Sequence, residues 1–354
     1  MAMSLQNADF LESLLQIESP SGHEETIQRQ WANYVKPHVH EMRTDVVGNV
    51  IAVINPEAAF KVLITGHCDE ISFMVQHIDE AGFIYFTEAG GIQAKNALGS
   101  RFRILGRKGI VKGVVGVSAA HHGDGDGKVE TKNLYIDCGF QSKAEALEWI
   151  QIGDAIVYDL EMTPLQNGRI AGRGLDNRTG AFIIAEVMRR LSQREVKVGV
   201  YGVSTVGEEV NMAGAYSAGA AINPNAALIS DVSFATDYPG IDARSHGEVK
   251  LGKGPILSVG SPINKRLNEK IEWAAAQANL PLQYELTPRM TGTDGDKIKY
   301  TGTGVPIALI SLPLRYMHSP SEVVVLEDIE NTIEVFCKTI EALNGDEIFS
   351  PLVL

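Results

Sequence analysis

The feature that most constrains the fold is a set of short apolar runs that alternate with longer amphipathic segments. The apolar runs are residues 49–54, 62–65, 196–203, 226–229 and 305–312. The segments with helical spacing of apolar residues are 179–192, 264–278 and 327–343. Strands that alternate with helices are typical of an α/β protein, with an open, mostly parallel central sheet flanked by helices on both faces.

The start of the chain predicts two helices ahead of the first strand. Apolar residues repeat at helical spacing over residues 8–17. The segment Ser21-Gly-His-Glu24 matches a capping box, so a second helix is expected to begin there and to run to about Val35. The apolar runs at 49–54 and 62–65 are then expected to form strands buried on both faces of a parallel sheet.

The middle of the chain has a different sequence pattern, in which short β-like runs are separated by glycine-rich turns. These runs are residues 109–117, 134–137 and 155–158. They predict a small β domain, resembling a barrel, inserted at residues 72–163. The α/β domain would then be discontinuous and consist of residues 1–71 and 164–354.

Composition narrows the class of protein. The chain has 354 residues, of which 44% are hydrophobic, which is enough to bury a large core. Its net charge of −13 argues against a surface that binds nucleic acid or an anionic membrane. Three separated cysteines indicate neither a disulfide framework nor a zinc knuckle. A leader and a long apolar span are not evident, so a cytoplasmic location is expected.

Ionisable side chains gather where the predicted strands end. Ligands of open α/β sheets bind outside the carboxyl ends of strands, so residues at those ends could share one crevice. The residues that lie just beyond apolar runs are His67, Glu208, Glu209, Asp231 and His318, and Asp176 precedes a predicted helix. Each has an ordinary explanation when taken alone, such as a surface histidine, an acidic first helical turn, a helix N-cap or a solvent loop. Their joint placement favours a single site.

Two imidazoles and four carboxylates match the needs of a hydrolytic centre with two metal ions. Such a centre uses a carboxylate that bridges the ions and further ligands on each ion. We assign Asp176 as the bridge, with His67 and Asp231 on one ion. Glu209 and His318 are assigned to the other ion.

Two further acidic residues receive roles beside the ligands. Glu208 is left as the general base, because consecutive residues point in different directions and Glu209 already serves as a ligand. Asp69 follows His67 by two residues and is expected to accept the remaining ring N–H of that histidine, which would fix its tautomer.

Four other segments are given simpler interpretations. Cys68 is expected to be a buried core thiol, because it points away from the face of His67. The sequence His121-His-Gly-Asp-Gly-Asp-Gly127 is interpreted as a hairpin tip rather than a metal loop. Residues 292–296 are interpreted as a turn near the site, not a phosphate-binding loop. Arg315 and Tyr316 could anchor a substrate, or Arg315 could pair with an acidic residue.

The local sequences around these residues resemble the M42 family of metallo-aminopeptidases, which includes glutamyl and deblocking aminopeptidases and the tetrahedral peptidases. The matching segments, in the family's order, are 66–71, 73–75, 174–178, 206–210, 230–232, 315–320 and 322–323. The resemblance implies that His67, Asp176, Glu209, Asp231 and His318 are metal ligands and that Glu208 is the base. It also implies a cis peptide after Asp176, and an inserted β domain that supports homo-oligomers from dimers to dodecamers.

Two residues depart from the family pattern. Cys68 stands where methionine is usual, and Ser72 stands where glycine is usual. Both adjoin the end of the strand that carries His67, so they could change packing or substrate fit, but every assigned ligand is retained.

These observations predict an aminopeptidase that uses two divalent ions, Zn²⁺ or Co²⁺, to hydrolyse the first peptide bond of short peptides. Three alternatives remain open. The first is a metal-free glycosidase, of the endoglucanase kind, that uses a carboxylate pair such as Glu208 and Asp231. The second is another metal-dependent amide hydrolase, such as a carboxypeptidase or an N-acyl deacylase. The third is an assembly protein with a vestigial site.

Overall fold

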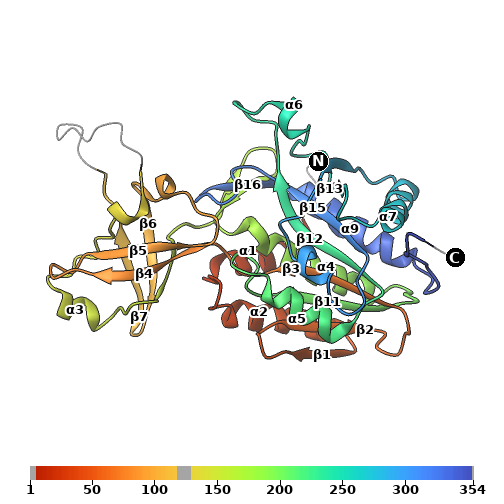
Figure 1. Cartoon of the computed structure of the whole chain (residues 1–354), viewed down its shortest axis with the longest axis horizontal. Coiled ribbons are helices and arrows are strands. Elements are labelled where there is room, and N and C mark those ends of the chain that lie inside the picture. The colour runs from red at the N-terminus through yellow and green to blue at the C-terminus, as the bar shows by residue number, and fades with distance from the viewer. Residues whose placement is uncertain (1–4, 118–128, 353–354) are drawn as a thin grey trace.

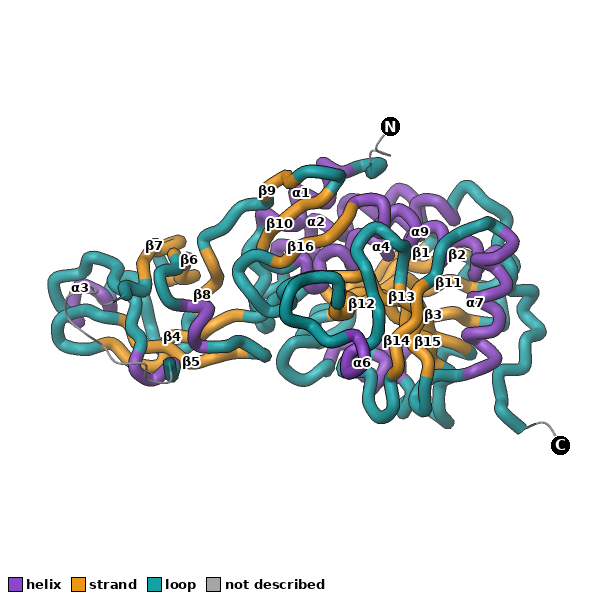
Figure 2. The backbone as a smooth tube through the Cα atoms, turned by 90° about the horizontal axis from the view of Figure 1, so that it is seen from above, coloured by secondary structure: helices purple, strands orange, loops and turns teal. Residues whose placement is uncertain are grey.

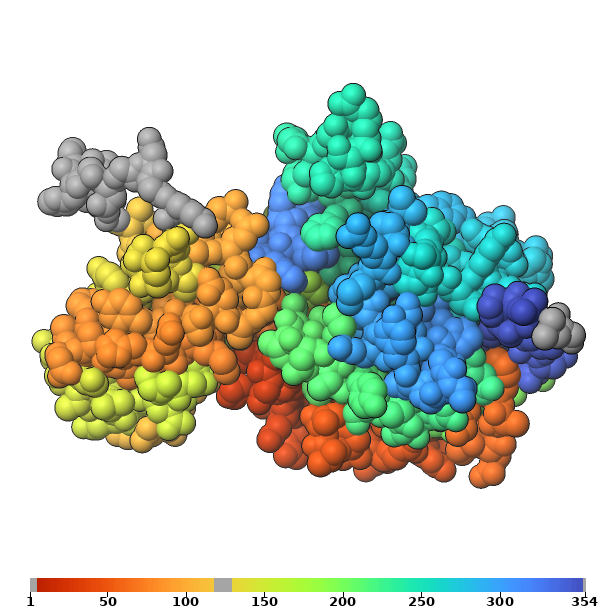
Figure 3. All heavy atoms as spheres, viewed as in Figure 1, coloured from red at the N-terminus to blue at the C-terminus, as the bar shows by residue number. Residues whose placement is uncertain are grey.

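The computed structural model describes residues 5–117 and 129–352, and it consists of two lobes (Figure 1). The larger lobe contains the central sheet and most of the helices, and the smaller lobe lies at one end of the molecule. Figure 3 shows the smaller lobe as the group of orange and yellow atoms beside the larger one. The predicted hairpin tip at 121–127 lies outside the described residues.

The central sheet has eight strands, and its pairing is mixed but mostly parallel. Their order across the sheet is β1 (Glu41–Thr44), β2 (Val50–Ile54), β11 (Gly199–Thr205), β3 (Lys61–His67), β12 (Ala226–Phe234), β15 (Ile307–Leu314), β13 (Ile256–Val259) and β14 (Gln283–Leu286). The neighbours β11–β3, β3–β12, β12–β15 and β13–β14 are parallel, and the other pairs are antiparallel. This confirms the predicted fold class.

The prediction of a parallel strand at residues 49–54 was wrong in direction. β2 is antiparallel to both of its neighbours, β1 and β11. The reason is the tight turn that precedes it, where an Asp45 carboxylate oxygen accepts the backbone amides of Val47, Gly48 and Asn49. A turn this short makes β2 run antiparallel to β1. β1 itself is a strand that the sequence pattern did not predict. β2 is nonetheless fully buried, because helices cover both faces.

Helices pack against both faces of the central sheet, as the alternating pattern predicted. One core cluster joins one face to α1 (Ala8–Gln16), α2 (Glu25–Val35), α4 (Leu175–Leu191), α7 (Lys265–Gln277) and α9 (Leu326–Glu341). The other cluster joins the opposite face to α5 (Ala213–Ile222) and α8 (Gly295–Ile298). Alternate residues of β3 divide between the clusters, with Val62 and Ile64 in the first and Leu63 in the second.

The predicted capping box at Ser21–Glu24 does not form. α2 begins at Glu25, and Glu24 makes no side-chain capping bond. Instead, the Ser21 hydroxyl donates to Asp69, and Glu24 accepts the backbone amide of Gly207. Ser21 and Glu24 therefore bond to residues distant in the sequence instead of capping α2. Both partners, Asp69 and Gly207, lie next to the strand ends where the ionisable residues gather.

The inserted segment forms a separate antiparallel sheet with its own core. Its strand order is β5 (Ile84–Ala89), β4 (Ser72–Ile78), β8 (Ala155–Tyr158), β6 (Arg101–Gly106) and β7 (Gly109–Val114). Phe73, Phe86 and Phe102 are fully buried at its centre, where the ring of Phe73 meets the other two edge to face. The predicted runs at 109–117 and 155–158 form β7 and β8, whereas residues 134–137 make only isolated bridges.

A third, small sheet lies between the two lobes in Figure 2 and consists of β16 (Glu322–Val325), β10 (Arg169–Gly172) and β9 (Thr163–Leu165). β10 leads into α4, and β16 follows the loop after β15. The remaining short helices are η1 (Lys36–His38), η2 (Ala94–Ala97), η4 (Thr131–Asn133), α3 (Lys143–Leu147) and α6 (Ala243–His246). The domain bounds at 72 and 163 remain a prediction.

Among the described residues, every helix is either too short or too polar to cross a lipid bilayer.

Candidate metal centre

The central sheet brings His67 and Asp231 together on neighbouring parallel strands. His67 is the last residue of β3, and Asp231 lies within β12. Thr65 pairs with Ile229, so the two ionisable residues lie at matching positions two residues further on. The sequence predicts that Asp231 lies just beyond its strand. β12 instead continues to Phe234, because its pairing with β15 extends that far.

The first half of the cluster surrounds the His67 imidazole. Its Nε2 atom lies 3.4 Å from Asp176 Oδ1 and 3.9 Å from Asp231 Oδ1. All three side chains are buried. Because one ligand atom from each lies within 4.8 Å of the others, this group could hold a metal ion. It is the set assigned to one ion from the sequence.

The second half of the cluster surrounds the His318 imidazole. Its Nε2 atom lies 3.2 Å from Asp176 Oδ2 and 3.3 Å from Glu209 Oε2. On the other side of the ring, Nδ1 lies 3.0 Å from the carbonyl oxygen of Gly91, which belongs to the inserted segment. The side chains of Asp176, Glu209 and His318 form a second group that could hold a metal ion. The Asp176 carboxylate therefore presents one oxygen to each histidine.

Glu208 lies at the edge of the first group. Its Oε2 atom is 3.7 Å from His67 Nε2, so His67, Glu208 and Glu209 form a third group close enough to hold a metal ion. Burial, and then the charge of Asp231, raise the pKa of Glu208 to about 10. Burial, and then the charge of Asp176, raise the pKa of Glu209 to about 7. Both shifts arise because carboxylates are crowded together away from water.

Asp69 fixes the backbone of the glutamate pair as well as the histidine. Its Oδ1 atom lies 3.3 Å from His67 Nδ1 and accepts the backbone amide of Glu208 at 3.1 Å. Its Oδ2 atom accepts the amide of Glu209 and the hydroxyl of Ser21. Burial raises the pKa of Asp69, but His67, Ser21 and the amide of Glu208 together outweigh burial and hold the pKa below its usual value. The sequence indicated the contact with His67 but not those with the two amides.

Asn177 explains why Asp176 is free to face the cluster. The peptide between Asp176 and Asn177 is cis, as the family resemblance implied. Asn177 Oδ1 accepts the backbone amide of Gly180, which is the bond that an N-cap residue makes, and Asn177 Nδ2 donates to the carbonyl oxygen of Ser230. The interpretation of Asp176 as the N-cap is therefore wrong. The cap is its neighbour, which also connects α4 to the strand of Asp231.

Glu322 is a buried residue near the cluster to which the sequence gave no role. Its two carboxylate oxygens accept the backbone amides of Asp176 and His318, at 3.1 and 3.0 Å. Burial raises its pKa well above the usual value. Only its place in the final matching segment, 322–323, could have signalled it, because one of its backbone partners lies far away in the sequence.

The donor set fits divalent metal ions. Zn²⁺ and Co²⁺ accept imidazole nitrogen and carboxylate oxygen together. Glu208 Oε1 and Glu209 Oε1 are buried without a hydrogen-bond partner among the described residues, which is costly unless a cation lies nearby. A pair of cations would also relieve the repulsion among four clustered carboxylates.

The cluster opens into a cavity of about 380 Å³. Gly292 and Thr293 line it, so a turn lies beside the site as predicted, although it covers residues 292–294 and residues 295–296 begin α8. Arg315 lies outside the lining and pairs with Asp237 at 2.8 Å, which is the ordinary alternative that the sequence left open. Cys68 is fully buried in the main core, as expected. Ser72 is buried at the start of β4.

Comparisons with known proteins agree with this geometry. The M42 glutamyl aminopeptidase family matches residues 48–335. A lysyl aminopeptidase from Pyrococcus furiosus is 34% identical over 337 residues, covering 92% of this chain and 95% of that protein. The TET aminopeptidase from a marine sediment archaeon of the Thaumarchaeota has a TM-score of 0.89 at 32% identity, covering 94% of this chain and 95% of that one.

Two further solved structures bear on assembly and on activity. The TET1 peptidase of Pyrococcus horikoshii, which can assemble into a tetrahedron or a large octahedral shell, has a TM-score of 0.85 at 26% identity, covering 95% of this chain and 99% of that one. A protein from Thermotoga maritima described as an endoglucanase has a TM-score of 0.76 at 27% identity, with 94% and 96% covered.

The fold and the cluster of imidazoles and carboxylates are those of a metal-dependent peptidase. The chain belongs to the M42 glutamyl aminopeptidase family, whose aminopeptidase relatives match it over nearly its full length.

Proposed function

We propose that this chain is an aminopeptidase that uses two divalent metal ions to hydrolyse the first peptide bond of short peptides. The observation that carries the proposal is the position of Asp176. One of its carboxylate oxygens faces His67 and the other faces His318, and each histidine has a further carboxylate beside it. A bridging carboxylate between two such half-sites is the arrangement that two-metal hydrolysis requires.

The proposed ligands fall into two groups, according to the distances between their ligand atoms. His67 and Asp231 would hold one ion, Glu209 and His318 would hold the other, and Asp176 would bridge them. Zn²⁺ or Co²⁺ would, when bound, polarise the carbonyl of the scissile bond and make water acidic enough to react near neutral pH. Asp69 and Glu322 would keep the ligands in place through their hydrogen bonds to the backbone.

Glu208 is the proposed proton carrier. It lines the cavity, its Oε1 atom has no partner among the described residues, and both features leave that oxygen available to a water molecule or to a substrate. A carboxylate in this position would take a proton from water and later return it to the leaving amine. The backbone of Glu208 is fixed by Asp69, which keeps the carboxyl aimed at the cavity.

The size and charge of the cavity favour action at a chain terminus. A cavity of about 380 Å³ is near the lower end of the range of small-molecule sites, which runs from roughly 300 to 1,000 Å³. It has room for about one residue and the bond that follows it. The carboxylates at its base offer a partner to the positively charged amino terminus of a peptide. A polysaccharide chain would need a longer groove.

The proposal is tested by separating metal binding from proton transfer. Glu208→Gln should lose most of its activity and keep its metal content, whereas His67→Ala should lose metal. Activity on aminoacyl anilides should disappear with a chelator and return with zinc or cobalt. Full activity of Glu208→Gln would contradict the role of this residue, and a reaction on glucan that ignores chelators would favour the glycosidase alternative.

Substrates with a blocked amino terminus, and substrates for cleavage at the carboxyl terminus, distinguish an aminopeptidase from the other amide hydrolases. An aminopeptidase should cleave a tripeptide with a free amino terminus and leave its N-acetylated form intact. Rapid release of acetate from the blocked peptide would identify a deacylase instead.

The assembly of the protein is also a proposal. We expect a homo-oligomer, between a dimer and a dodecamer, with the inserted sheet at subunit contacts. Sedimentation of the purified protein would measure its size.

A further inference from the structure

Apart from the ionisable cluster, the wall of the cavity is neutral. Among the described residues that line it, the charged side chains all belong to the cluster already assigned, and the remainder are apolar or uncharged. The largest neutral side chains in the lining are Met212, Val232, Phe234 and Met317. A substrate side chain that enters this space therefore meets hydrocarbon and thioether groups, together with the hydroxyls of Ser233, Thr291 and Thr293.

Three of these lining side chains come from different elements. Met212 precedes the first residue of α5, Phe234 ends β12, and Met317 lies in the loop after β15. Phe234 is 65% exposed, which is unusual for so large an apolar side chain. Methionine side chains adapt to the shape of an apolar partner. Together they form a surface suited to a flexible apolar side chain.

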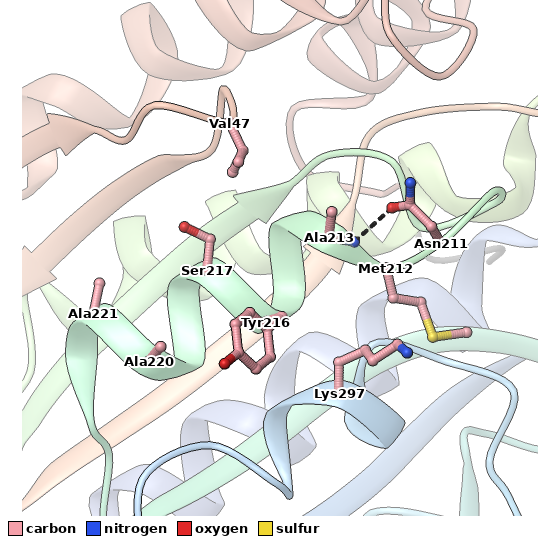
Figure 4. A pocket seen from close by; sticks show the side chains of 9 residues that line it. All are labelled: Val47, Asn211, Met212, Ala213, Tyr216, Ser217, Ala220, Ala221 and Lys297. Atoms are coloured by element: carbon pink, nitrogen blue, oxygen red, sulfur yellow. Dashed lines mark hydrogen bonds between the residues drawn. The ribbon is translucent and has the colours of Figure 1, made fainter.

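Arg315 and Lys297 are two nearby cations that do not line the cavity. Arg315 is engaged with Asp237 through its Nε atom, and it also donates to the carbonyl oxygen of Asp237. Lys297 lines a neighbouring pocket of about 790 Å³, which Figure 4 shows with its lining side chains. Met212 lines both spaces, whereas Lys297 lines only the neighbouring one.

We propose that the site selects peptides whose first residue is neutral and apolar, with Met212, Phe234 and Met317 as the specificity-determining residues. This inference rests on the proposed aminopeptidase function. A glutamyl side chain would place a carboxylate near four others without a cation of its own. In the proposed complex the lining carboxylates already serve the metal ions, the transferred proton and the amino terminus of the substrate, so a lysyl side chain would meet no further carboxylate. Burial of an unpaired charge is costly, so both should be disfavoured.

The first test compares four tripeptides that differ only in the first residue, with methionine, glutamine, glutamate or lysine before two alanines. Their side chains have similar lengths and differ in charge and polarity. We expect kcat/KM to be highest for the methionine peptide. The values for the glutamate and lysine peptides should be lower by at least about tenfold, because each would bury a charge without a partner. A preference for glutamate or lysine, in a chelator-sensitive reaction, would overturn the inference and leave the aminopeptidase proposal intact.

A pair of variants tests the wall directly. Phe234→Lys places a cation at the mouth of the cavity, and the exposure of Phe234 makes the change compatible with folding. It should raise the kcat/KM ratio of the glutamate to the methionine peptide by about tenfold. Leu286→Lys is the control, because Leu286 is 76% exposed and lies outside the lining. Equal ratios in the two variants would contradict a role for Phe234.

Binding provides a readout without turnover. Calorimetry with the zinc-loaded Glu208→Gln variant measures the affinity for each of the four peptides even if the wild-type protein cleaves none of them. Tightest binding of the methionine peptide supports the inference. Equal affinities, or the absence of binding for all four, overturn it. Inert wild-type protein would separately contradict the aminopeptidase proposal.

Discussion

Glu322 holds the backbone of Asp176 through a hydrogen bond of 3.1 Å, and its other carboxylate oxygen holds the backbone of His318 at 3.0 Å. One buried carboxylate thus sets the spacing of two proposed ligands that lie far apart in the sequence. Asp176 is also the residue that faces both histidines. The arrangement of the cluster depends on this connection as much as on the ligands themselves.

Glu322→Gln should weaken metal binding. An amide has one acceptor oxygen, so one of the two backbone amides would face an N–H₂ group and lose its partner. Removal of such a supporting residue costs roughly 10–100-fold in metal affinity. Zinc titration with a competing chelator measures this. Glu327→Gln is a control, because Glu327 is exposed in the first turn of α9 and is absent from the cluster. Equal affinities of wild type and Glu322→Gln would refute the positioning role.

Asp69→Asn should impair both metal binding and turnover. The amide can no longer accept bonds at both of its terminal atoms, so the backbone amide of Glu208 or Glu209 loses its partner. We expect a loss of roughly 10–100-fold in zinc affinity. Ser21→Ala removes a single hydroxyl donor to the same carboxylate and should cost about 1 kcal/mol of stability, with metal content unchanged. Undiminished zinc affinity in Asp69→Asn would argue against this role.

Gly66→Ala should disturb the packing of the helix that carries Asp176. A Cβ atom at Gly66 would lie 2.5 Å from the backbone carbon of Gly180 in α4, so strand and helix would have to separate. Overpacking of this kind costs about 1–3 kcal/mol, and it should also lower metal content. Gly116→Ala is the control, because a Cβ atom at Gly116 would meet no described atom within 4 Å beyond its chain neighbours. Thermal unfolding measures both, and equal midpoints would contradict close packing at Gly66.

The ion pairs of Glu334 in α9 with Arg190 in α4 and Arg194 just beyond α4 predict an acid-sensitive contribution to stability. Burial raises the pKa of Glu334, but hydrogen bonds from Arg194 and Arg190 outweigh it and hold the pKa below 4.5. A carboxyl whose pKa is lowered by folding stabilises the protein above its unfolded pKa. That contribution is lost as the pH falls through the folded pKa.

Glu334→Gln should therefore destabilise the protein by about 1 kcal/mol at pH 7, a modest value because the pairs are partly exposed and screened. The difference from wild type should shrink as the pH falls below about 4.5. Glu269→Gln, which removes an exposed pair with Lys265, should change little. Urea unfolding across this pH range gives the comparison, and a difference independent of pH would exclude the ionic origin.

The sequence predicted the α/β class because hydrophobic periodicity directly reflects which faces of strands and helices are buried. It also indicated the six residues of the cluster, because the ends of parallel strands meet at one edge of a sheet. The structure brings those six together, at the positions where β3, β12 and α4 converge.

The features that the sequence did not predict depend on long-range contacts. Ser21 and Glu24 have the spacing of a capping box, but their partners are Asp69 and Gly207. Asn177 caps α4 in place of Asp176 because the chain turns sharply there. Hydrogen bonds to distant backbone groups leave no periodic pattern, and for the same reason Glu322 received no role.

The most direct test of the two-metal proposal is anomalous diffraction at the zinc absorption edge from crystals of the zinc-loaded protein. We expect two peaks, one beside His67 and Asp231 and the other beside Glu209 and His318, with the Asp176 carboxylate between them. A single peak, or peaks that lie away from these residues, would contradict a two-metal centre.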